Sequence, residues 1–148
     1  MRNNDMNERW LSPHFKLSEF TRSATAIKLR IKNEPTEADV ERLRLLCEHV
    51  LEPLRRRFGV IRITSGFRCP QLNAAVGGVE RSQHLTGEAA DIHVSSVEAA
   101  RRMADFVRRE TTFDQLLLER RLSNGCVWLH VSFTAQRANR RQYRECWV

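Results

Sequence analysis

The sequence lacks the features of a membrane protein, a secreted precursor or a repeat protein. No apolar run is long enough to span a membrane, and residues 1–10 are too polar to form a secretory signal. Internal repeats, low-complexity segments and heptad patterns are also absent. The sequence therefore predicts a monomer that is made and folded in the cytoplasm.

Cysteine is scarce and is not spaced for metal binding. No two cysteines form a C-x-x-C pair, which argues against a thiolate zinc cluster. Cys47 falls among the apolar positions of an expected helix, so we expect a buried thiol there. The even number of cysteines permits disulfides without requiring them. The four are Cys47, Cys69, Cys126 and Cys146.

Aromatic residues are few, at 7%, whereas 25 Lys and Arg against 18 Asp and Glu give a net charge of +7. Positive charge attracts nucleic acids, and equally anionic cell-wall polymers and lipid headgroups. A basic nucleic-acid-binding module is therefore one alternative. The arginines are not interleaved with aromatic residues and no nucleic-acid motif is present, so we expect no specific nucleic-acid partner.

Length and composition fit one soluble domain. The 148 residues are 41% hydrophobic and 29% charged, which suffices to bury an ordinary core. Residues 1–14 are expected to form a flexible N-terminal arm, because their first part is polar and charged. Residues 15–148 are expected to form the domain, with an arginine-rich tail at 136–144 that either covers the sheet or remains mobile.

Capping residues and periodicity predict the helices and strands. Thr36 with Asp39, and Ser95 with Glu98, are capping signatures, and Pro53 is expected to kink the first helix or to start a second one. The expected helices run from Thr36 to Gly59, from Pro70 to Val76 and from Ser95 to about Arg109, and the expected strands are 60–64, 88–94, 113–119 and 126–133. We therefore expect a small α+β domain, a mainly antiparallel sheet with helices packed on one side.

The most informative segment runs from Ser82 to Asp91 and places a histidine and an aspartate seven residues apart. His84 comes from a loop and Asp91 from the strand that follows a turn at Gly87, so both can converge on one ion. His130 supplies a second imidazole. Two imidazoles and one carboxylate form the ligand set of a catalytic zinc site, which leaves a fourth position for water. The sequence thus predicts a Zn²⁺ site at these three residues, on the open side of the sheet.

Each of these residues also has an ordinary structural interpretation. His84 could be a loop histidine, Asp91 a cap at the end of a strand, and His130 a core histidine whose hydrogen bonds are satisfied. His93 shares the strand face of Asp91. With three ligands already assigned, we expect His93 to support the ligands or to lie in the core.

Further motifs occur in a characteristic order along the chain. They are the segments 15–20, 51–55, 63–70, 72–78 and 82–84, then the pattern S-x-H-x-x-G-x-A-x-D and a distant W-x-H. With these motifs the chain resembles the D-alanyl-D-alanine metallopeptidases from about residue 15 to residue 133, and it is similar to their small phage-type peptidoglycan peptidases. The resemblance implies a zinc-dependent peptidase that cleaves peptidoglycan stem peptides, as a DD- or LD-carboxypeptidase or endopeptidase. It also implies action on the bacterial cell wall, after release by a holin or carriage on a virion.

The resemblance assigns His84, Asp91 and His130 to zinc and places Arg68 against the substrate. A guanidinium can grip a peptide carboxylate or the scissile carbonyl at two points and stabilise the negative charge that develops there. The alternative for Arg68 is a solvated surface arginine. We expect lesser roles for two polar residues, because Gln115 and Ser132 can hydrogen-bond to the substrate or the ligands, or to the backbone.

The general base departs from the pattern that this family usually shows. Many relatives carry a carboxylate three or six residues before the last zinc histidine, but Val127 and Asn124 occupy those positions here. Glu119 is the nearest upstream carboxylate, so we expect it to accept the proton of a zinc-activated water and to pass it to the departing amine. Asp114 is the second choice. A solvated charge is the alternative for Glu119, and a zinc-bearing domain that binds peptide or cell wall without cutting it is the alternative for the protein.

Hairpin geometry decides whether Glu119 can serve. A turn at 122–125 pairs Glu119 with Trp128 and Leu117 with His130, which places Glu119 and His130 on one sheet face as diagonal neighbours. A turn shifted by one residue would put Glu119 on the other face, because side chains alternate along a strand. The sequence predicts the first register.

Overall fold

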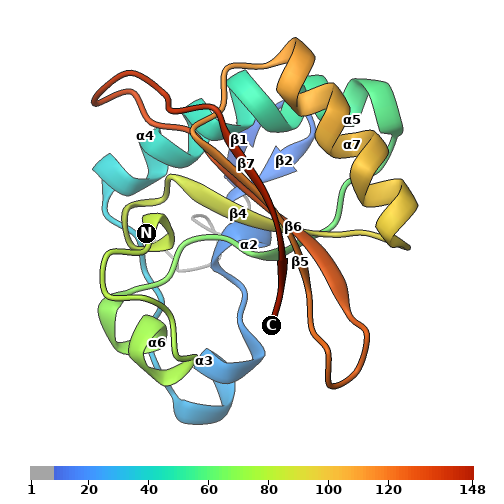
Figure 1. The fold of residues 1–148 in the computed structure, drawn as a ribbon. Coiled ribbons are helices and arrows are strands. Elements are labelled where there is room, and N and C mark those ends of the chain that lie inside the picture. Colours follow the sequence, from blue (N-terminus) through green and yellow to red (C-terminus); the bar gives the residue numbers. More distant parts are fainter. Residues whose placement is uncertain (1–8) are drawn as a thin grey trace.

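The computed structural model describes residues 9–148, which form an α+β domain around a five-stranded sheet (Figure 1). The strand order is β3-β4-β6-β5-β7. The three pairings β3–β4, β4–β6 and β6–β5 are antiparallel, whereas β7 pairs with β5 in parallel. The strands are β3 (Ile63–Ser65), β4 (Ala89–His93), β5 (Gln115–Arg120), β6 (Val127–Ser132) and β7 (Gln142–Trp147). The predicted α+β class with a mainly antiparallel sheet is confirmed.

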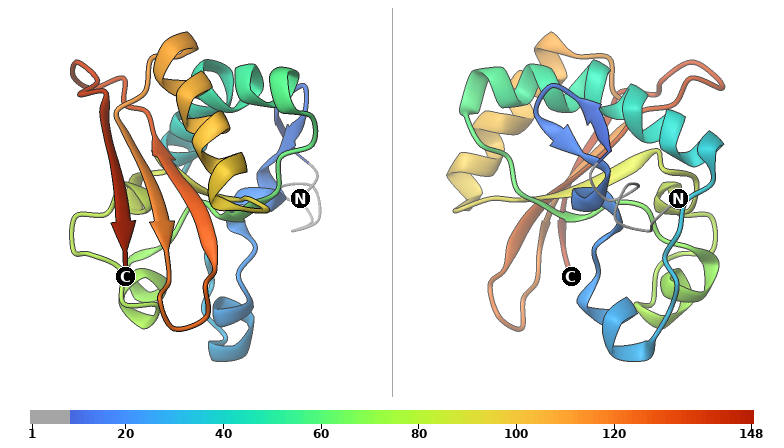
Figure 2. Two further views of the ribbon diagram at one scale, coloured as in Figure 1. Left: turned by 45° about the vertical axis from the view of Figure 1, so that its right-hand side comes forward. Right: turned by 180° about the vertical axis from the view of Figure 1, so that it is seen from behind.

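Helices cover the apolar face of the sheet. The longer ones are α4 (Glu37–Leu46), its π-helical continuation Cys47–Leu51, α5 (Glu52–Phe58) and α7 (Val97–Glu110). Figure 2 shows α7 along one face of the sheet, where it contacts β5 and β6. Leu116, Leu118 and Leu129 are fully buried on that face. The intervening residues of the same strands point to the opposite face, because side chains alternate along a strand.

Four shorter helices complete the described part of the domain. They are α2 (Leu17–Thr21), α3 (Ala24–Leu29), α6 (Pro70–Ala75) and the 3-10 helix Gln83–Thr86. In Figure 1, α3 and α6 lie side by side, away from α4, α5 and α7. Among residues 9–148, no helix combines the length and hydropathy that a membrane crossing requires.

The first capping prediction is confirmed and the second is shifted by one residue. The Thr36 hydroxyl accepts from the Asp39 N–H, and the Asp39 carboxylate accepts from the Thr36 N–H. At α7 the cap is Ser96, whose hydroxyl accepts from the Ala99 N–H. The expected Ser95 cap with Glu98 is therefore wrong, because the helix begins at Val97 and only the preceding serine can reach its first free N–H groups.

Pro53 lies at the start of a second helix, which confirms one of the two expectations for this residue. It lies in the first turn of α5, next to the π-helical turn that precedes this helix. The chain does not break there, because the π-helical turn Cys47–Leu51 joins α4 to α5. A π turn accommodates an extra residue per turn, so both helices keep their apolar faces on the core.

The ordered domain begins before the expected boundary at residue 15. The strands β1 (Trp10–Ser12) and β2 (Phe15–Lys16) pair in a short ribbon, and Leu11 is buried. The buried Glu52 carboxylate accepts hydrogen bonds from the Ser12 hydroxyl and the His14 N–H, which fixes the ribbon to α5. The arm prediction is therefore wrong for residues 9–14, whereas residues 1–8 lie outside the described part.

The arginine-rich tail at 136–144 is an ordered loop that leads into β7, and one carboxylate fixes it. Asp114 is fully buried and accepts two hydrogen bonds from the Arg137 guanidinium. It also accepts from the Arg140 backbone and guanidinium and from the Gln83 amide. Burial alone would raise the pKa of Asp114, but the hydrogen bonds from Arg137 and Arg140 outweigh it and hold the pKa below its usual value. These bonds lead the chain into β7, which covers the edge of β5.

Asp114→Asn is expected to lower the free energy of unfolding by about 2–3 kcal/mol, because two arginines and a backbone N–H lose a charged acceptor. Chemical denaturation measures the loss. Asp105→Asn is the matched control, since Asp105 is exposed and pairs with Arg108 at 3.8 Å, and it should change stability by no more than about 0.5 kcal/mol. Equal losses in both variants would contradict the role of Asp114.

The effect of Asp114 also has a defined pH dependence. Its pKa is lowered in the folded state, so its contribution to stability is complete above the unfolded pKa of about 3.9 and is lost as the pH falls below it. The stability difference between wild type and Asp114→Asn should therefore shrink as the pH falls from about 5 to about 2. A difference that stays constant over this range would show that the ionised carboxylate is not what matters.

Candidate metal centre

Three side chains from separate elements converge on the sheet face opposite α7. Asp91 lies in the middle of β4 and is paired in register with His130 on β6. His84 lies in the 3-10 helix that precedes β4. Gly87 ends that helix with a φ of +76°, and a side chain there would lie 2.6 Å from the backbone of Asp39. The expected turn at Gly87 is confirmed, and it lets the chain return to place His84 beside Asp91.

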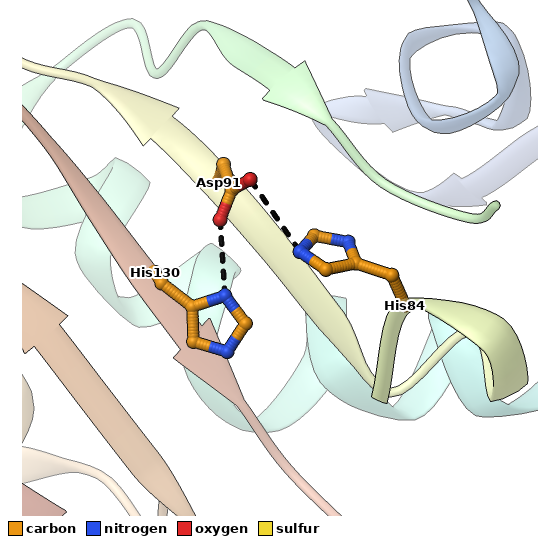
Figure 3. Close-up of side chains that lie close together, drawn as sticks. All are labelled: His84, Asp91 and His130. Atoms are coloured by element: carbon orange, nitrogen blue, oxygen red, sulfur yellow. Dashed lines mark hydrogen bonds and ion pairs between the residues drawn. The ribbon is translucent and has the colours of Figure 1, made fainter. Parts of the chain in front are cut away.

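Asp91 is the centre of the group (Figure 3). Its Oδ1 lies 3.0 Å from His130 Nδ1, and its Oδ2 lies 3.4 Å from His84 Nε2. One candidate ligand atom from each of the three residues lies within 4.8 Å of the others. Imidazole nitrogens and a carboxylate oxygen at this spacing form a donor set that suits zinc.

The orientation of His84 supports a metal site. Its Nδ1 lies 2.6 Å from the Gly66 carbonyl oxygen, so Nδ1 carries the proton and donates it there. Nε2 is then an acceptor that faces the Asp91 carboxylate, and it is buried with no hydrogen-bond partner among residues 9–148. Two acceptors that face each other in a buried place are satisfied by a cation between them. The residues present therefore fit a zinc ion.

The ionisation of Asp91 agrees with this arrangement. Burial alone would raise the pKa of Asp91, but the contacts with His130 and His84 outweigh burial and hold the pKa well below its usual value. The carboxyl group is therefore ionised at neutral pH. An ionised carboxylate is the form that coordinates a metal ion.

A pocket of about 1040 Å³ opens over these three residues. Arg68 and Glu119 line it together with His84, Asp91 and His130. The predicted hairpin register is confirmed, because Glu119 pairs with Trp128 and Leu117 with His130, and the Arg121 N–H donates to the Cys126 carbonyl across the turn. Glu119 therefore shares the sheet face of His130.

Glu119 and Arg68 are both half-buried, and each feels the other's charge. Burial raises the pKa of Glu119, the nearby Asp91 raises it further, and His130 and Arg68 oppose these effects. Burial lowers the pKa of the Arg68 guanidinium, and Asp91 and Glu119 oppose that shift. A carboxyl group with a raised pKa holds a proton more readily than a solvated one does. Glu119 is therefore not a fully solvated charge, and Arg68 is not a solvated surface arginine, which were the alternatives for these residues.

The other candidate residues are placed differently. Gln115 lines the pocket, as does His93, whose side chain is exposed, so the core role that was one expectation for His93 is wrong. Ser132 is fully buried, and its hydroxyl accepts from the Gln115 N–H, which is the backbone bond given as the alternative for this residue. Asp114 cannot serve as a base, because its carboxylate is buried and held by Arg137 and Arg140.

Sequence reasoning missed the arginines that gather at the pocket. Among the described residues, Arg22, Arg81, Arg121 and Arg140 line it in addition to Arg68, and its acidic side chains are Asp91 and Glu119. They come from four distant segments, and in a chain with a net charge of +7 nothing in the sequence distinguishes them from other arginines. Only the fold brings them together.

The fold and the site define the class of the protein. An α+β domain with a His-Asp-His group in a pocket is an arrangement that can hold a hydrolytic metal ion. The profile of the Peptidase M15 family matches residues 13–132, which is most of the chain. The chain therefore belongs to the Peptidase M15 family, which comprises the D-alanyl-D-alanine metallopeptidases and their relatives and is zinc-dependent in general. A comparison with curated protein sequences gives no match.

Asp91→Ala and His84→Ala are expected to abolish high-affinity zinc binding, because each removes one of three donors. Titration calorimetry against a competing chelator measures the affinity. His93→Ala is the matched control, since it removes an exposed imidazole from the strand that carries Asp91 and should leave the affinity within about twofold. Unchanged zinc affinity in Asp91→Ala would contradict the site.

Proposed function

We propose that the protein is a zinc peptidase that hydrolyses the stem peptides of bacterial peptidoglycan. The observation that carries the proposal is the convergence of His84, Asp91 and His130 in one pocket with Glu119 and Arg68. In this proposal the first three residues hold zinc. When bound, zinc supplies a Lewis acid that polarises a carbonyl and lowers the pKa of water.

Glu119 is the proton carrier of the proposed reaction. It lies on the face of His130 and lines the pocket, so its carboxylate can accept a proton from the attacking water. Burial raises its pKa, which helps the same group to keep that proton until the amine of the cleaved bond takes it. The carboxylate thereby returns to its starting state at the end of each turnover.

Arg68 binds and orients the peptide. Its guanidinium lines the pocket, and its Nε has no hydrogen-bond partner among residues 9–148. A planar guanidinium donates two parallel hydrogen bonds to a carboxylate or a carbonyl, and the same donors stabilise negative charge in the transition state. Partial burial strengthens these bonds because water competes less for them.

The shape and charge of the pocket support an acidic peptide longer than a dipeptide. Its volume of about 1040 Å³ is at the upper end of common small-molecule sites. Among the described residues, Arg22 and Arg81 line the pocket without a carboxylate partner, and Arg121 on the β5–β6 hairpin packs on the Trp128 ring. Stem peptides of peptidoglycan carry several carboxylates, which these arginines can attract.

Glu119→Gln is expected to keep zinc and to lose at least about 100-fold in kcat on wall fragments, because an amide cannot accept the proton. Mass spectrometry of purified peptidoglycan fragments, incubated with zinc-loaded protein, identifies the cleaved bond and the rate. Glu145→Gln is the matched control, since Glu145 lies on the neighbouring strand and binds Arg101. If Glu119→Gln stays fully active, Glu119 is not the base. Intact fragments with zinc-loaded wild type would instead favour a binding domain.

Arg81→Ala is expected to raise KM for acidic peptides several-fold and to weaken the salt dependence of kcat/KM, because one attractive charge leaves the pocket. Steady-state kinetics at low and high ionic strength tests this. Arg102→Ala removes the same charge from the exposed surface of α7, outside the pocket. If the two variants behave alike, net charge rather than the pocket attracts the substrate.

A further inference from the structure

The backbone around Arg68 is held on both sides by one side chain. The Asn33 amide donates to the carbonyl of Phe67 at 2.9 Å, and its oxygen accepts from the N–H of Cys69 at 2.8 Å. The Arg68 N–H itself donates to the His84 carbonyl at 3.0 Å. The residue therefore starts from a fixed backbone that is bonded directly to a member of the His-Asp-His group.

The nitrogens of the Arg68 guanidinium differ in their hydrogen bonding. Its Nη1 donates to the side-chain oxygen of Asn73 at 3.2 Å. Asn73 is buried, and its amide nitrogen donates to the Val79 carbonyl at 2.9 Å, so the amide cannot turn over without losing both bonds. Nε of Arg68 is buried and has no partner among residues 9–148. Asn73 therefore holds Nη1 of the guanidinium, whereas Nε is a buried donor that no described residue accepts from.

Gly78 makes this arrangement possible. A Cβ at this position would overlap Asn73 Oδ1 and would lie 2.7 Å from Arg68 Nη1. The φ of Gly78 is not in the left-handed region, so its backbone suits other residues and only the close approach requires glycine. Gly77 next to it differs, because it has a φ of +72° and open space around its Cα.

We propose that Asn73 is a positioning residue for Arg68 and that Gly78 provides the room it needs. Asn73 fixes Nη1, so that the guanidinium is held in one orientation for a carboxylate or carbonyl of the bound peptide. A guanidinium that is fixed in advance loses less rotational freedom when it forms two bonds to the substrate. This role rests on the proposed peptidase function, because Asn73 acts only through Arg68.

Gly78→Ala tests the proposal in the kinetics of the zinc-loaded enzyme. We expect kcat/KM on wall fragments to fall about 10- to 100-fold, because the guanidinium is displaced by about 1 Å, while zinc content stays unchanged. Gly77→Ala is the matched control, since it strains the backbone and lowers the melting temperature without touching the pair. If Gly77→Ala lowers kcat/KM as much as Gly78→Ala, the effect is one of loop stability and the proposal fails.

A double-mutant cycle shows whether Asn73 acts through Arg68. Asn73→Leu should lower kcat/KM when Arg68 is present. In a protein that already carries Arg68→Ala, the same change should alter kcat/KM less than twofold. Additive losses would overturn the proposal. If Arg68→Ala alone leaves kcat/KM unchanged, the proposed function of Arg68 is at fault instead.

An NMR measurement decides the matter without activity. Rotation of the Arg68 guanidinium should be slow in the wild type, giving separate Nη signals at low temperature, and fast in Asn73→Leu. Asn73→Asp keeps an oxygen acceptor for Nη1 and should restore the slow rotation. Rapid rotation in the wild type would overturn the proposal even if the protein cleaves no peptide.

Discussion

The carboxylate of Asp91 is the constraint around which the site is built. An isolated carboxylate in a sheet face is costly to bury, so it requires partners that satisfy both oxygens. His130 reaches one oxygen because β4 and β6 pair with the two residues directly opposite. His84 places its acceptor Nε2 3.4 Å from the other oxygen, which leaves that oxygen for a cation, because a 3-10 turn and a left-handed glycine return the chain to the start of β4. The same three side chains form the donor set of the proposed zinc ion, so the pairing register of β4 and β6 and the affinity for the metal depend on each other.

The two faces of the sheet have separate tasks. One is apolar and packs on α7, whereas the other carries the polar residues of the pocket. Glu119 belongs to β5, which is an interior strand only because β7 covers its outer edge. β7 is in turn led into place by the bonds from Arg137 and Arg140 to Asp114. Asp114 therefore supports the strand of Glu119 from a distance, although it takes no part in the pocket.

Local patterns in the sequence predicted local structure well. The turn at 122–125 gave the register that places Glu119, and Thr36 with Asp39 gave the start of α4. The sequence did not predict β7, because Gln142–Trp147 is an exposed edge strand without apolar alternation, and its placement depends on distant bonds to Asp114. The strand pattern placed Ser132 on a face of the sheet but did not predict that its side chain is buried, since that burial depends on the neighbouring backbone of Gln115. The pocket arginines and the Asn73–Arg68 pair likewise exist only in three dimensions.

The central claim is that His84, Asp91 and His130 hold zinc in this pocket. Anomalous diffraction at the zinc edge, from crystals of the zinc-loaded protein, tests it most directly. The account predicts one strong peak in contact with these three side chains and at bonding distances of about 2.0–2.2 Å. A peak at a cysteine, or no peak beside Asp91 in protein that contains zinc, would contradict it.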